Sequence, residues 1–133
     1  VPMVAARSSP GRQANSREEI LVKYALLIYS KPGSHESLSE SDSAAAMQEY
    51  AALSSDPTCL GGAQLEPPHT ATTVQVQDGQ MLTTDGPYAD TKEYFGGYYV
   101  FEAVDLDAAL ALAGRIPAAR IGGRVEVRPV VER

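Results

Sequence analysis

Two residues of this chain, Asp85 and His69, have the chemistry of a proton-transfer pair. Asp85 opens the segment Asp85-Gly86-Pro87-Tyr88, in which glycine and proline fix a tight turn. A carboxylate there is a candidate general base, and an imidazole is the usual proton shuttle near neutral pH. Contact with a carboxylate would orient the imidazole and make it more basic. We therefore treat Asp85 and His69 as candidate catalytic residues.

Both side chains also have structural interpretations that the sequence leaves open. Asp85 could accept backbone N–H bonds and simply hold the turn, as aspartate commonly does. His69 follows Pro67-Pro68 and could be an exposed loop residue. The environment of Asp85 should decide between a catalytic and a structural role.

Four further residues are candidate substrate-binding groups. Tyr88 could form a hydrogen bond with a ligand oxygen, and Lys92 could bind an anionic group. Tyr24 and Tyr98 fall on expected strands, where they would line a cleft or pack in the core. We expect His35, in a loop rich in serine, glycine and proline, to be exposed.

Composition narrows the class of protein. The 133 residues suffice for one domain, and the formal net charge of −6 disfavours non-specific binding to nucleic acid or anionic membranes. No apolar run approaches the roughly 20 residues that span a bilayer. Cys59 is the only cysteine, which excludes an intrachain disulfide and fits a reducing, cytoplasmic location. Without zinc-type spacing or a phosphate loop, we expect neither a metal nor a cofactor.

Periodicity and turn signals predict the element order β-α-β-β-β-β-α-β. Ser39 and Asp105 are expected to cap the two helices, and Asp78-Gly79 is the strongest hairpin signal. The expected strands cover residues 23–29, 59–65, 72–77, 80–84, 98–103 and 124–130. The expected buried helix faces are Met47, Tyr50 and Ala51, with Leu53, in the first helix and Leu106, Ala109, Leu110 and Ala113 in the second.

Removing the middle hairpin leaves βαββαβ, a ferredoxin-like α+β arrangement. Two helices cover only one face of such a sheet, so the other face needs an apolar partner. The apolar groups expected on strand faces are Val74, Val76, Tyr98 or Tyr99, Val125 and Val127. A second copy stacked sheet to sheet is the simplest solution, so we expect a homodimer.

Residues 1–21 differ from the rest in composition. They carry three arginines, two prolines and several small polar residues, and no acid precedes Glu18. We expect a disordered or extension-like tail there, followed by one α+β domain over residues 22–133.

The quoted motifs resemble those of the YCII-related, or DGPF-type, domain family. The resemblance rests on residues 23–29, 71–79, 83–93, 96–100, 105–107, 115–118 and 125–130, and so covers nearly everything after residue 22. It implies a bacterial dimeric α+β barrel. The family's Asp-Gly-Pro-Phe is Asp85-Gly86-Pro87-Tyr88 here, which adds a hydroxyl group. Val22 stands where such proteins often begin with methionine, so residues 1–21 are expected to be an upstream extension.

The resemblance implies no single reaction. Some family members look like enzymes that use a His–Asp pair, and others are encoded beside extracytoplasmic-function sigma factors. One expectation is therefore cofactor-free acid–base chemistry on a small organic molecule, such as proton transfer, elimination or isomerisation. The alternative is a non-catalytic accessory or regulatory module that binds a ligand or protein. Whether the chain is an enzyme stays open at this point.

Overall fold

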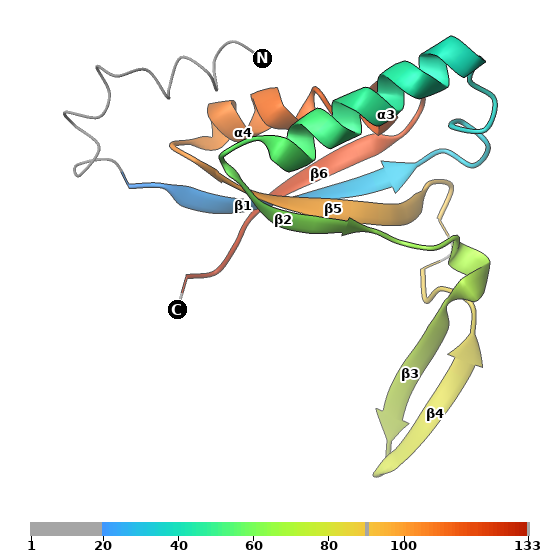
Figure 1. The fold of residues 1–133 in the computed structure, drawn as a ribbon. Coiled ribbons are helices and arrows are strands. Elements are labelled where there is room, and N and C mark those ends of the chain that lie inside the picture. The colour runs from blue at the N-terminus through green and yellow to red at the C-terminus, as the bar shows by residue number, and fades with distance from the viewer. Residues whose placement is uncertain (1–19, 90, 133) are drawn as a thin grey trace, which may run out of the picture.

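The computed structural model describes residues 20–89 and 91–132. A four-stranded antiparallel sheet has strand order β2-β5-β1-β6, and β3 and β4 form a separate two-stranded sheet (Figure 1). The strands are β1 Val22–Ser30, β2 Cys59–Gln64, β3 Thr72–Gln77, β4 Gln80–Asp85, β5 Tyr94–Ala103 and β6 Arg124–Pro129; the helices are α3 Glu40–Ser55 and α4 Leu106–Ala113, with the short 3₁₀ turns η2 Pro68–Thr70 and η3 Pro117–Arg120. The predicted element order and the ferredoxin-like core with an extra hairpin are confirmed. Of the tail predicted over residues 1–21, residues 1–19 lie outside the described residues.

The local signals in the sequence form the expected caps and turn. The Ser39 hydroxyl accepts a hydrogen bond from the Asp42 backbone N–H at 3.1 Å, and the Asp105 carboxylate accepts one from Ala108 at 2.9 Å. Each bond satisfies one of the amides that a helix start leaves without an intrahelical partner. Asp78 and Gly79 both have positive φ, 51° and 78°, which a two-residue type I′ hairpin turn requires.

The core lies between the sheet and the two helices. Its largest fully buried side chains include Phe101 of β5, Leu26 of β1, Leu53 of α3 and Leu112 of α4. Alternation along β1 and β5 sends every second residue toward the helices, and those residues are the buried ones. The sheet therefore has one dry face and one face without helices.

Both helices are rotated relative to the predicted faces. In α3, Ala46 and Leu53 are buried, while Met47 is 68% exposed and Ala51 is exposed. In α4, the buried residues are Ala108, Ala109, Leu112 and Ala113, while Leu106 and Leu110 lie at the surface. The predicted faces were therefore partly wrong. The buried face of each helix combines alanine with one leucine, Leu53 in α3 and Leu112 in α4.

The face of the sheet away from the helices, called here the open face, also differs from the prediction. Val125 and Val127 of β6 pack against the core, and Tyr99 is buried in it, so these three do not belong to the open face. Register instead pairs Leu27 with Tyr98 on that face. Its apolar members, assigned by alternation along the strands, are Ala25, Leu27, Tyr29, Ala63, Phe95, Tyr98 and Val100. Figure 1 shows both helices on the other side of the sheet.

Candidate functional site

The backbone brings the segments of His69 and Asp85 to one corner of the molecule. Thr72 pairs with Asp85 at the base of the hairpin, three residues after His69. One step further, the Gly86 N–H donates to the Ala71 carbonyl at 2.7 Å. The Thr73 hydroxyl donates to the Gly86 carbonyl at 2.8 Å, so the turn after β4 is tied to the start of β3. The His69 turn and the end of β4 are therefore fixed neighbours.

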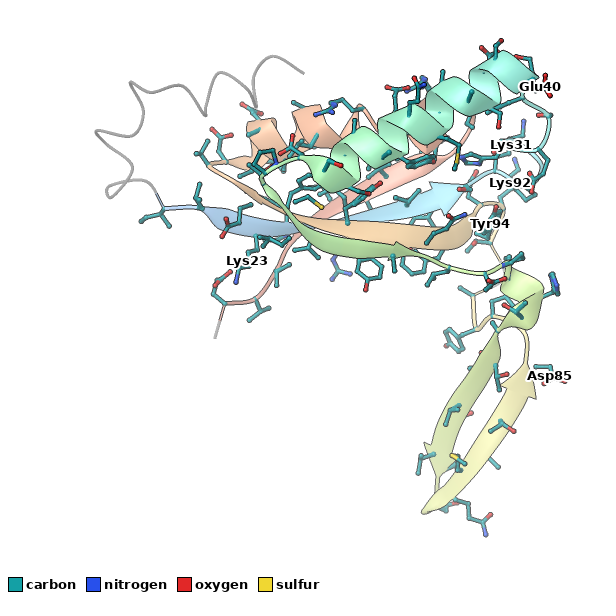
Figure 2. All side chains as sticks on the ribbon, in the orientation of Figure 1. Lys23, Lys31, Glu40, Asp85, Lys92 and Tyr94 are labelled. Carbon is teal, nitrogen blue, oxygen red and sulfur yellow. The ribbon has the colours of Figure 1, made fainter. Side chains whose placement is uncertain are left out.

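Within a single chain the two side chains do not form a pair. Both Asp85 and His69 are exposed, and no hydrogen bond joins them among the described residues. In Figure 2 the Asp85 side chain points outward from the base of the hairpin. One chain thus holds both groups at one corner but leaves them in water. Catalysis there would need another surface to exclude solvent.

Tyr88 and Lys92 flank this corner without closing it. Tyr88 is 90% exposed, which makes it one of the most exposed large side chains in the described region. Lys92 is exposed and lies at the same end of the sheet as Lys31 and Tyr94 (Figure 2). Tyr94 pairs with Ser30, the last residue of β1. Lys92 could supply positive charge to an anion at this end of the sheet.

Tyr24 and Tyr98 lie on opposite faces of the sheet. Tyr24 is 6% exposed and belongs to the core between sheet and helices. Tyr98 is 37% exposed and lies on the open face opposite Leu27. The structure does not bring these two tyrosines into one cleft, and Tyr24 packs in the core.

A polar pair on the helix side of the molecule was missed by sequence reasoning. His35 Nε2 lies 2.9 Å from the Tyr50 hydroxyl, and Tyr99 donates its hydroxyl hydrogen to the Tyr50 carbonyl at 2.9 Å. Burial raises the pKa of Tyr50 to about 12. His35 is half-buried, so the expectation that it is exposed was wrong. The loop after β1 folds back onto α3, and no sequence pattern links His35 to Tyr50, which follows it by fifteen residues.

The described residues hold few features of other kinds of site. In residues 20–89 and 91–132, no group of three or more His, Cys, Asp or Glu side chains is placed to hold a metal ion. A shallow hollow is lined by Gln64, Leu65, Glu66 and Pro67, where the chain leaves β2 for the hairpin. None of the helices in the described region combines the length and apolarity needed to cross a bilayer.

Comparison with known proteins gives a family match and a relative. The model of the YCII-related domain matches residues 22–133. An uncharacterized protein of Rhizobium meliloti (strain 1021) is 30% identical over 112 residues, which cover 80% of this chain and 90% of that protein. The matched region begins at the first residue of β1 and includes every element described above. The chain belongs to the YCII-related domain family.

Proposed function

We propose that this protein is a homodimer that carries out cofactor-free acid–base chemistry on a small organic molecule. Asp85 or His69 would remove a proton, and Tyr88 or Lys92 would stabilise the negative charge that develops. The reaction class would be proton transfer, elimination or isomerisation. We place the protein in the bacterial cytoplasm as part of this proposal, because its single cysteine fits a reducing compartment.

The observation that carries this proposal is the corner at the base of the hairpin. A carboxylate and an imidazole extend from backbone segments that the Gly86–Ala71 hydrogen bond holds together. The backbone of both residues is therefore held at one corner, while their side chains would have to meet in the assembled protein. Asp85 ends strand β4 and His69 lies in the turn η2 just before β3, and a site carried by hydrogen-bonded segments is better positioned than one between two loose loops.

The open face supports the dimer. Leu27, Tyr98 and Val100 lie on adjacent strands of a face that carries no helix, and Tyr29 packs against Phe95 with ring centroids 5.5 Å apart. Tyr98 and Phe95 are exposed and the others are partly exposed, and a continuous apolar sheet face of this kind is typical of a surface that another protein covers. Stacking two such faces would bury them, as in sheet-on-sheet packing.

A direct test of the chemistry is hydrogen–deuterium exchange at activated C–H bonds. A panel of small ketones, keto acids and activated halides in deuterated water would be followed by NMR with and without protein. Asp85→Asn should lower any catalysed exchange by about 100-fold or more, because a positioned general base contributes on that scale. Equal exchange by the wild type and a folded Asp85→Asn variant would contradict the assignment.

A second test asks whether the two side chains meet in solution. The Asp85→Asn substitution should change the ring proton chemical shifts of His69. The other histidine, His35, bonds Tyr50 on the helix side and serves as the internal control in the same spectrum. Unchanged His69 signals would mean that the pair does not form in the assembled protein.

The second candidate function is a non-catalytic binding module, for example one that contacts an extracytoplasmic-function sigma factor. The observation in its favour is exposure, since Asp85, His69 and Tyr88 all face water in the single chain. An acidic protein would suit a basic protein partner better than nucleic acid. If Tyr88→Ala weakens capture of such a partner while no exchange activity is found, this alternative gains support.

A further inference from the structure

The hairpin of β3 and β4, called here the arm, has two chemically different faces. Register pairs Val74 with Thr83 and Val76 with Met81, so their side chains share one face, which we call the apolar face of the arm. Thr72 and Asp85 lie on the same face, at the base of the arm. The opposite face carries Thr73, Gln75, Gln77, Gln80, Thr84 and one large apolar residue, Leu82.

The arm has little support from its own chain. It forms a sheet of its own, with no strand pairing to the four-stranded sheet. Val76 and Met81 are each 68% exposed. An isolated two-stranded hairpin is marginally stable in water, and its exposed apolar side chains indicate a surface that is covered in use. The apolar face of the arm therefore lacks a partner within one chain.

The direction of the arm indicates which surface its apolar face would contact. Figure 1 shows the arm leaving the sheet on the side away from the helices, which is the side of the open face. Its strands have six residues each, or about 20 Å of length, whereas stacked sheets pack about 10 Å apart. A second copy stacked on the open face would therefore lie alongside the arm rather than beyond its tip.

Charge also favours a second copy. The arm carries Asp78 and Asp85 and no lysine or arginine, within a chain of net charge −6. The open face has a local excess of cations despite that overall charge. Its charged members are Lys23, Arg124 and Arg128 against Glu102 and Glu126, as the strand pairing places them. The open face of a second copy, with one more cation than anions, would therefore complement the acidic arm.

We propose that each arm packs its apolar face against the second copy of the chain, so that the site beside Asp85 is completed by the partner subunit. This inference rests on the proposed homodimer and deepens the proposed function. Asp85 lies on the apolar face, at its base, so docking of the arm would turn that carboxylate from water toward the partner. The same event would exclude solvent from the corner shared with His69.

The test compares the two faces of the arm. Val76→Gln with Met81→Gln makes the apolar face polar, and Leu82→Gln makes the matched change on the opposite face. Sedimentation equilibrium should show the dimer dissociation constant raised about 10,000-fold by the double change, since it removes the apolar side chains of both arms, four per dimer, and each is worth roughly tenfold. Leu82→Gln should stay within about threefold of the wild type. Circular dichroism checks the fold of each variant.

The outcomes separate the two proposals. If the wild type is a dimer and the double change leaves its dissociation constant unchanged, arm docking is overturned. The sheet-stacked dimer would still stand, and the partner of the arm would be a different protein. A wild type that stays monomeric at its highest soluble concentration would overturn both. Loss of dimer in the double variant but not in Leu82→Gln would support the arm.

A second measurement does not depend on destabilising the dimer. A spin label on Gln80→Cys, in a chain carrying Cys59→Ser, would be mixed with unlabelled ¹⁵N-enriched chains. Broadened amide signals in β1 or β6 of the enriched chain can only come from the arm of another copy. Absence of broadening in a mixed dimer would overturn the proposal.

Discussion

The imidazole Nε2 of His35 lies 2.9 Å from the hydroxyl oxygen of Tyr50, across fifteen residues of sequence. This contact fixes the loop after β1 onto the first helix. The Tyr50 carbonyl in turn accepts the hydroxyl hydrogen of Tyr99 from the central strand β5. Loop, helix and sheet are therefore joined through one half-buried tyrosine.

Stability should depend on pH through Tyr50. Burial raises the pKa of Tyr50 to about 12 from 10.0, so the folded chain keeps a proton that the unfolded chain releases. The stabilisation that comes from this difference in the pKa of Tyr50 is fully present below about pH 10 and is lost as pH rises toward 12. We expect wild type to lose on the order of 1 kcal/mol more than Tyr50→Phe across that range, a value reduced for partial exposure. Urea unfolding at several pH values measures this difference.

At neutral pH the same substitution should cost about 1 kcal/mol, the net value of one hydrogen bond. Tyr88→Phe is the control, because the Tyr88 ring is 90% exposed. Equal stability of Tyr50→Phe and wild type, at neutral and at high pH, would show that the His35 contact contributes nothing.

Truncating Leu53 should damage the core far more than truncating Met47. Leu53 of α3 is fully buried and Met47 is 68% exposed on the same helix. Leu53→Ala is expected to lower the free energy of unfolding by about 2–5 kcal/mol, through lost burial and the cavity left behind. Met47→Ala should change it by less than about 0.5 kcal/mol. Chemical denaturation of both variants measures the two values, and similar losses would mean that α3 packs through its other face.

This pair of residues shows what the sequence could and could not predict. Caps and the Asp78-Gly79 turn depend on neighbouring residues, and the structure confirms them. The helix face depends on what the helix meets in space. Ala46 is buried and Met47 is not, although methionine is the larger apolar group, because burial follows the face that the helix turns toward the sheet and not the size of the side chain.

The candidate site shows the same division. The hairpin signal correctly implied that Asp85 would stand at a strand end after a returning strand. It could not place the His69 side chain, whose direction depends on the turn between two prolines and β3. The His35–Tyr50 contact was also beyond prediction, since it depends on the path of a nine-residue loop from residue 31 to 39.

Removing the cap of α4 should weaken that helix specifically. The Asp105 carboxylate accepts a hydrogen bond from the Ala108 backbone N–H. The helix has only eight residues, so this one bond is a large part of its hydrogen bonding. Asp105→Ala is expected to cost about 1 kcal/mol. Asp107→Ala is the matched control, because Asp107 is an exposed acid in the same first turn that contributes only a smaller interaction with the helix dipole. Thermal unfolding compares them, and equal effects would argue against the cap.

Gly62 should not tolerate a side chain. A Cβ built there would lie 2.3 Å from the backbone oxygen of Tyr98, so β2 and β5 would have to separate. Gly62→Ala is expected to cost about 2–3 kcal/mol, in the range of overpacked cores. Gly114→Ala is the control, since its nearest contact would be 3.6 Å and its backbone is helical. Amide exchange along β5 would locate the damage; unchanged protection in Gly62→Ala would contradict the expected clash.

Excising the arm should leave the core folded. The Gly86 N–H already bonds the Ala71 carbonyl at 2.7 Å, so Asn-Gly can replace residues 72–85 and close the gap with a tight turn. The core cluster contains no residue of the arm. We therefore expect native-like circular dichroism and, at chain concentrations where the wild type is also monomeric, a melting temperature within a few degrees of the wild type, about 1 kcal/mol or less in stability.

The excised chain would also separate folding from assembly. Since the arm is exposed and makes no ladder with the main sheet, its loss should appear in the dimer dissociation constant rather than in the unfolding of the single chain. Sedimentation equilibrium and thermal unfolding on one preparation measure both quantities. Loss of the folded state on excision would mean that the arm is part of the folding unit.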